Sequence, residues 1–250
     1  VIGITGSVAD VKKFYADADK ADANNNNAAT DFVNGSDNEA VTLTDTTVDA
    51  GDLAIIRIAA GPGTSGAVTL SNVTTLTGTS TEIKNAVHSG GFGNVSGIPN
   101  NVTATISEAT VNAENLKLID AAIGGLVTVD STATKLSGSL NDVKAVLKSS
   151  KLVADATNDT TGVETVTIVG LNNLDVTVVG AVDAVAKADF ISDNYTVGKV
   201  NADIDVTAKV ATFLDSDHAN YIKPGNAYDL IVTGDTPATL ASTDIPNVFT

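Results

Sequence analysis

A nine-residue phrase occurs three times in this chain, and its repetition limits the folds that the chain can adopt. The phrase reads ITGSVADVK at residues 4–12, LTGTSTEIK at 76–84 and LSGSLNDVK at 136–144. The copies share an apolar residue, Thr or Ser, Gly, Ser or Thr, two free positions, Asp or Glu, Val or Ile, and Lys. Internal repetition of this kind indicates a repeat architecture.

A second phrase divides the chain into units. EAVTLTDTTVDAGDL begins at Glu39, and its counterpart ATISEATVNAENL begins at Ala104. Together the phrases define a unit of roughly 60 residues, which is interpreted as two strand-plus-helix halves. The predicted organisation is a partial repeat with an Asn/Asp-rich loop at 1–37, repeat units at 38–101 and 102–163, and a degenerate, β-rich repeat region at 164–250.

Within each unit, alternating β-branched segments precede amphipathic ones. Residues 40–45 (AVTLTD) and 66–78 (GAVTLSNVTTLTG) are predicted strands, while 49–60 and 79–89 are predicted helices. Strand–helix pairs of about 30 residues imply parallel strands joined by helices. The predicted fold is therefore α/β, a repeat-built solenoid with parallel strands and short capped helices, with a β-rich solenoid or sandwich modules as the alternative.

The repeated phrase predicts a strand-to-helix junction. Thr79 and Glu82 have the spacing of a capping box, in which each residue satisfies a backbone amide of the other. The preceding Gly78 allows a sharp turn. A phosphate-binding loop is disfavoured because Lys84 lies inside the helix and not at its start. The same spacing recurs at Ser7 with Asp10 and Ser139 with Asp142, and the predicted helix faces carry Ile83 with Val87 and Val143 with Leu147.

The less regular parts of the chain carry further predictions. Residues 16–38, which include an Asn run, are interpreted as a surface loop or linker. In the last region, helices are predicted at 181–191 and 206–214. The segments DVTVVGAV and AYDLIVTG, which begin at Asp175 and Ala227, are predicted to be β-rich.

Charge and composition exclude several partners. The 30 acidic and 14 basic residues give a net charge of -16, which repels nucleic-acid phosphates and anionic lipids. No stretch is long and apolar enough to insert into a membrane, and no signal peptide is evident. Cysteine is absent, which excludes a disulfide framework. Methionine is also absent, so Val1 is not expected to be the translation start, and the chain is expected to be a processed product or part of a longer one.

The acidic residues have two interpretations, solubility with helix capping or binding of a hard divalent cation. Carboxylates at repeat-equivalent turns suit calcium, although capping explains Asp49 equally well. The glycine-rich GGFGNVSGI from Gly90 departs from a calcium-binding nonapeptide because Val95 stands where Asp is required. The candidate metal ligands are Asp45, Asp49, Asp52, Glu108 and Glu114, with Asp215 and Asp217 beside His218 as a weaker set.

The segment NEAVTLTDTTVDAGDL, together with GAVTLSNVTTLTGTSTEIKNAV, resembles the units of Thr/Ala/Val/Asp-rich arrays in large secreted cell-surface proteins of marine cyanobacteria and proteobacteria. These proteins are S-layer-like or adhesin-like, and some also carry hemolysin-type calcium repeats. The resemblance covers about residues 38–150. It implies secretion and a structural or adhesive role, and it supplies no catalytic residues.

These observations favour a structural protein without enzymatic activity. The predicted function is that of a component of an extracellular surface layer or filament, which assembles with copies of itself or with neighbouring repeats and has calcium as a candidate cofactor. One alternative is a calcium-dependent adhesin spacer module. Another is a carbohydrate-binding β-solenoid, which the scattered six Phe and four Tyr disfavour. Two His without Cys offer little basis for nucleophilic catalysis.

Overall fold

The computed structural model of the chain describes residues 3–23, 40–60, 67–88, 95–96, 98–150, 166–180, 182, 191, 195–206 and 227–232. Over most of this range the order of elements is strand, turn, strand, helix. The elements are β1 Ile4–Gly6, α1 Val8–Ala23, β2 Val41–Leu43, β3 Thr47–Asp49, α2 Ala50–Ala59, β4 Val68–Thr69, β5 Thr75–Gly78, α3 Ser80–Val87, β6 Val95–Ser96, β7 Thr103–Ile106, β8 Thr110–Asn112, α4 Ala113–Ala122, β9 Val127–Val129, β10 Lys135–Gly138, α5 Leu140–Ser150, β11 Ile168–Val169, β12 Asp175–Val178, β13 Val200–Val206 and β14 Ala227–Val232.

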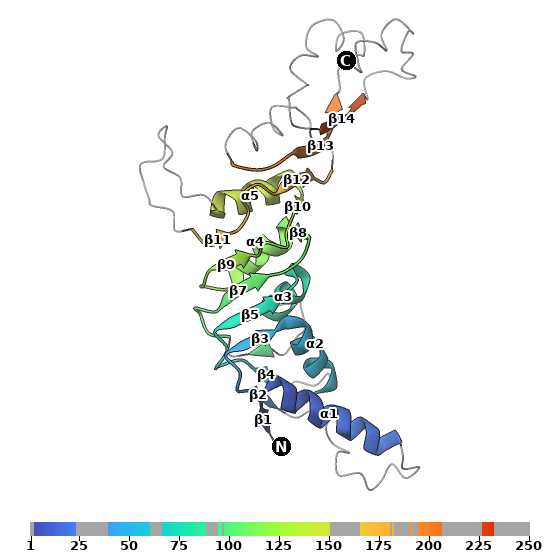
Figure 1. Ribbon diagram of the computed structural model, residues 1–250, viewed down its shortest axis with the longest axis vertical. Coiled ribbons are helices and arrows are strands. Elements are labelled where there is room, and N and C mark those ends of the chain that lie inside the picture. Colours follow the sequence, from blue (N-terminus) through green and yellow to red (C-terminus); the bar gives the residue numbers. More distant parts are fainter. Residues whose placement is uncertain are drawn as a thin grey trace, which may run out of the picture. The chain divides into compact units, whose positions relative to one another are not determined.

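The strands form three parallel sheets. The first sheet has the order β1-β2-β4-β6, the second β11-β9-β7-β5-β3, and the third β14-β13-β12-β10-β8. In the second sheet, β3, β5, β7 and β9 come from successive strand–helix units, two in each repeat, and lie one beside the next (Figure 1). The fold is thus α/β, with parallel sheets and alternating strand–helix units, as the repeat spacing predicts.

The chain folds into two compact units, which we call module 1 and module 2. Module 1 comprises residues 1–108, 115–132 and 167–169 and contains the first and second sheets. Module 2 comprises residues 109–114, 133–166 and 170–250 and contains the third sheet. The domain boundaries inferred from the sequence repeats stay a prediction.

The prediction of a single strand over residues 66–78 is wrong, because a turn divides the segment. Residues 66–78 contain β4 and β5, which belong to the first and second sheets, and 126–138 likewise contain β9 and β10. Polar turn residues separate the two strands of each pair. In the second pair, for example, the Thr132 amide donates to Asp130 at 2.9 Å. Short polar side chains of this kind bond the nearby backbone and so end a strand.

The strand that directly precedes a helix belongs to different sheets along the chain. Helix α1 follows a strand of the first sheet, α2 and α3 follow strands of the second, and α4 and α5 follow strands of the third. The change from the second sheet to the third occurs after β6, a two-residue strand that pairs with β4. This strand lies within the glycine-rich segment from Gly90. After this additional strand, the two described helices that follow, α4 and α5, come after strands of the third sheet.

The inner face of the second sheet is a continuous apolar row. Val48, Leu76, Ala104, Val127 and Ile168 are neighbours in register and are all at most 1% exposed. Each large side chain buried in this way contributes about 1.5–3 kcal/mol to the free energy of unfolding. Branched aliphatic side chains therefore supply a core in a chain that has little aromatic content.

The helices bury equivalent positions. Helix α2 buries Ala50, Leu53 and Ile56, and α3 buries Ser80, Ile83 and Ala86. In α5, Val143 and Leu147 are buried as predicted. The predicted pairing of Ile83 with Val87 needs correction, because Ala86 is the buried partner and Val87 is only partly buried.

The irregular segments are partly as predicted. Helix α1 extends to Ala23, so the interpretation of residues 16–38 as a loop is wrong for 16–23, where alanine-rich sequence favours helix. Residues 24–39 lie outside the described residues. Strands β12 and β14 confirm the β-rich prediction at Asp175 and Ala227. The helices predicted at 181–191 and 206–214 lie almost wholly outside the described residues, and Val206 ends β13.

Candidate functional site

The strand-to-helix junction of the repeated phrase is fully formed at α3. The Glu82 amide donates to Thr79 Oγ1 at 3.3 Å, and the Thr79 amide donates to Glu82 Oε2 at 2.9 Å. This reciprocal pair is the predicted capping box. It satisfies two backbone donors that the first helical turn leaves without an intrahelical acceptor.

The junctions at α1 and α5 have serine and aspartate in the places of Thr79 and Glu82. The Asp10 and Asp142 amides donate to Ser7 Oγ and Ser139 Oγ at 3.1 and 3.2 Å. In return, each serine hydroxyl donates to the aspartate carboxylate at 2.7 Å. The capping residues are therefore confirmed. At α3 the Thr79 hydroxyl likewise donates to Glu82 Oε2, at 2.8 Å.

The glycine of the phrase is required for different reasons at different junctions. Gly78 has φ +140°, a conformation that side chains with a Cβ rarely adopt. At Gly138, a Cβ would lie only 2.7 Å from Ala113 Cβ, so close packing requires the glycine. At Gly6 the nearest atom would be 3.5 Å away, an ordinary contact. The predicted conformational role is thus confirmed at Gly78, whereas the spacing to Ala113 explains Gly138.

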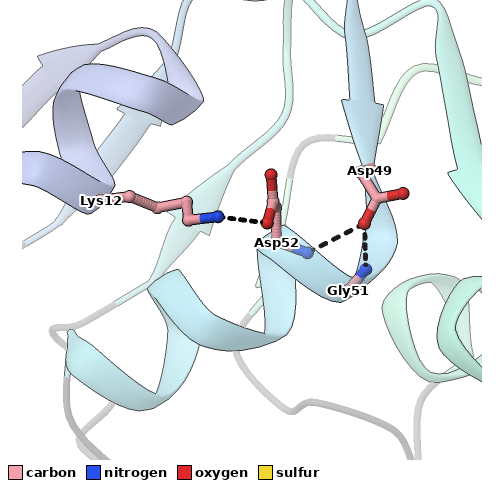
Figure 2. Close-up of polar contacts among 4 residues, drawn as sticks. All are labelled: Lys12, Asp49, Gly51 and Asp52. Carbon is pink, nitrogen blue, oxygen red and sulfur yellow. Dashed lines mark hydrogen bonds and ion pairs between the residues drawn. The ribbon is translucent and has the colours of Figure 1, made fainter.

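Two of the predicted metal ligands lie at the start of α2 (Figure 2). Asp49 is the N-cap, and its Oδ1 accepts from the Gly51 amide at 2.9 Å and from the Asp52 amide at 3.1 Å. Asp52 forms an ion pair with Lys12 of α1. About a third of each side chain of this pair is exposed, so its contribution is of the order of 0–1 kcal/mol. Sequence reasoning did not single out Lys12.

Two other predicted ligands bind helix N-termini of the preceding repeat. Asp45 Oδ2 accepts from the Val8 amide of α1 at 2.6 Å, across 37 residues of sequence. Glu108 Oε1 accepts from the Ser80 amide of α3 at 3.1 Å, across 28 residues. A carboxylate at this position complements both the free amide and the positive end of the helix dipole. These acids connect one repeat to the next.

The remaining predicted ligands are not gathered with these. Glu114 lies in the first turn of α4, while Asp215, Asp217 and His218 lie outside the described residues. Among the described residues, no group of three or more His, Cys, Asp or Glu side chains is placed to hold a metal ion. Helix capping accounts for Asp45, Asp49 and Glu108, and calcium binding stays a prediction.

Asp130 is a further acid that the sequence did not single out. It follows β9, and its Oδ1 accepts from Thr132 Oγ1 at 2.5 Å and from the Thr132 amide at 2.9 Å. These bonds, with a smaller contribution from Ser107, lower the pKa of the Asp130 carboxyl below its ordinary value. The carboxylate thereby stabilises the turn that leads into β10.

The outer face of the second sheet carries threonines in register, which the sequence reasoning also missed. Threonine at alternate positions in 75–77 and 103–105 was the available signal, since alternate residues of a strand share one face. The threonines are exposed or partly exposed. We call this set the threonine array: a first column of Thr47, Thr75 and Thr103, and a second of Thr77, Thr105 and Thr128 that begins beside Asp49.

Comparisons with protein-family models, with curated proteins and with solved structures give no match to this chain. The resemblance to bacterial cell-surface arrays therefore stays a prediction. Within the described ranges, no helix combines the length and the apolar character that crossing a bilayer requires.

Proposed function

We propose that this chain is a structural, non-enzymatic component of an extracellular surface layer or filament and that its repeats form an α/β solenoid. The observation that carries the proposal is the direction of strand pairing. In the second sheet, β3, β5, β7, β9 and β11 pair in chain order, and every pair is parallel. Each strand–helix unit thus adds to the previous one by the same kind of contact.

Parallel addition has a consequence for assembly. The two outer strands of such a sheet, β3 and β11 in the second sheet, present different edges, and each is complementary to the edge at the opposite end. A second copy can continue the sheet by a head-to-tail contact. A contact of this kind that does not close into a ring produces a filament or layer.

Capping between repeats supports the same function. Asp45 and Glu108 each stabilise the helix of the repeat before their own. Carboxylates at helix N-termini contribute about 0.3–1 kcal/mol each. Neighbouring repeats are therefore joined by specific polar contacts in addition to the sheets, as expected for a structural scaffold.

Negative-stain electron microscopy of the purified chain, with millimolar calcium and again with chelator, tests the proposal. Ordered filaments or layers support it, and their loss in chelator would give calcium a role in the assembly. Dispersed particles in both conditions would contradict self-assembly. The chain would then be better described as an adhesin spacer.

A paired set of variants locates any calcium effect. The double variant Asp45→Asn and Asp49→Asn removes two carboxylates while keeping side-chain oxygens that can cap a helix, because Asn and Asp are similar N-caps. Asp130→Asn is the matched control, since it removes an acid outside the predicted ligand set. If the predicted ligands bind calcium, chelator will have no further effect on the double variant and its full effect on the control.

A further inference from the structure

The threonine array is a two-dimensional lattice of one chemical group. Neighbouring threonines of one column lie on adjacent strands about 4.7–4.9 Å apart, and the two columns are separated by two residues of a strand, about 6.6 Å. The registers Thr75 with Thr103 and Thr77 with Thr105 place four threonines at the corners of one cell. Thr47 and Thr128 extend the two columns in opposite directions.

Two hydroxyls of the array, those of Thr75 and Thr103, are held in position by hydrogen bonds. Thr75 Oγ1 and Thr103 Oγ1 are 3.1 Å apart and share a hydrogen bond. Thr103 Oγ1 also donates to the Thr74 carbonyl at 3.2 Å. Threonine is stiff at χ1 because it is β-branched. A ligand that binds this face therefore orders few side chains, which reduces the entropic cost of binding.

The hydroxyl groups of the array can form the same kinds of hydrogen bonds as water molecules. Each hydroxyl offers one donor and two acceptor lone pairs, as a water molecule does in part, and each methyl group is a small apolar contact. In the described registers of the second sheet, the one charged residue beside the array is Asp49, at the edge of the second column.

From these observations we infer that the threonine array binds crystalline water, that is, the surface of ice. Crystal faces of ice present oxygen atoms in a two-dimensional repeat similar in size to the cell of the array. Hydroxyls occupy positions of the water lattice, and the methyl groups rest between them. Each contact is weak, and the contacts add because they are in register on a sheet whose inner side is fully packed.

Freezing measurements on the full chain test the inference. We expect a gap between the melting and freezing points and faceted ice crystals under the microscope. Thr105→Lys, near the centre of the array, is expected to abolish both. The long lysine side chain would hold the ice surface away from the neighbouring threonines. Thr77→Lys, which perturbs the same cell from another strand, provides a second variant in case one folds poorly.

Thr177→Lys is the matched control, because Thr177 is a partly exposed threonine on the outer side of β12 in module 2. It adds the same charge, and we expect full activity. Circular dichroism checks that each variant is folded. An unaltered freezing point with unfaceted crystals for the wild type overturns the inference, and so does equal loss in Thr177→Lys and Thr105→Lys. Binding to insoluble chitin or cellulose that Thr105→Lys abolishes would assign the face to a polysaccharide instead.

Discussion

The second sheet, in module 1, and the third sheet, in module 2, have the same inner face and different outer faces. Inside, Leu76 and Leu136 occupy similar strands and are both fully buried. Outside, the second sheet carries the threonine array. The third sheet has mixed residues in register: Thr110, Lys135 and Asp175 in one column, and Asn112, Ser137, Thr177 and Asn201 in another. Packing therefore constrains the inner positions in both modules, while the outer positions are open to different chemistry.

The largest expected effect tests whether the two inner faces are equivalent. Leu76→Ala and Leu136→Ala each remove a fully buried side chain and are expected to lower the free energy of unfolding by about 2–5 kcal/mol. Urea unfolding followed by circular dichroism measures both. A loss well below this range at one of the two sites would show that its core can collapse around the cavity, and the equivalence would be broken.

The second test separates the two reasons for a glycine before a helix. Gly138→Ala places a Cβ against Ala113, and overpacking of this kind costs about 1–3 kcal/mol. Gly78→Ala forces a left-handed backbone on alanine, at a similar cost of about 1–3 kcal/mol. Ala113→Gly in the Gly138→Ala background should recover part of the lost stability, because it removes the Cβ that the new side chain meets.

The matched control for this rescue is Ala50→Gly in the Gly78→Ala background. Ala50 would lie 3.6 Å from the new Cβ, an ordinary contact, so no recovery is expected. Double-mutant cycles in urea measure both coupling energies. Equal coupling at the two junctions would contradict the distinction between backbone strain and close packing.

A smaller effect is expected at the start of α3. Ser80 is fully buried and its hydroxyl has no hydrogen-bond partner, whereas the equivalent residue of α2 is the buried Ala50. Since an unpaired buried hydroxyl is costly, Ser80→Ala is expected to stabilise the protein by roughly 1 kcal/mol. The reciprocal Ala50→Ser should destabilise it. Thermal unfolding of both variants checks the opposite signs, and a destabilising Ser80→Ala would mean that the hydroxyl has a role in the folded state.

The smallest effect concerns pH. The pKa of Asp130 is lowered in the folded protein by the hydrogen bonds from Thr132. The ionised carboxylate therefore contributes to stability at pH values above the ordinary pKa of a carboxyl group. This contribution is lost as the pH falls through the folded-state pKa. Asp130→Asn should therefore destabilise the protein at neutral pH and have less effect in acid. Melting temperatures across an acid titration measure the difference, and a constant difference at every pH would contradict the assignment.

Much of the fold follows from the sequence, because the repeated phrase has one physical meaning. Gly78, Thr79 and Glu82 predict a turn, a cap and a helix, and the structure has all three. Parallel pairing follows from strands that alternate with helices. The number of strands does not follow from the sequence. Ser71 and Asn72 were interpreted as part of one strand, whereas they form the turn between β4 and β5.

The functional residues were harder to predict than the fold. The acids at Asp45 and Glu108 are evident in the sequence, but their acceptor role depends on amides 37 and 28 residues away. A carboxylate that caps a distant helix and one that binds a cation have the same local sequence. The threonine array has a local signal, yet its two columns exist only when strands from several repeats are in register.

The capping of one repeat by the next also sets an order in time. A ribosome makes the first turn of α1 well before Asp45, and the first turn of α3 well before Glu108. Helices α1 and α3 therefore receive these amide bonds only after the following repeat has emerged. The first turns of these two helices are completed one repeat behind the growing end of the chain.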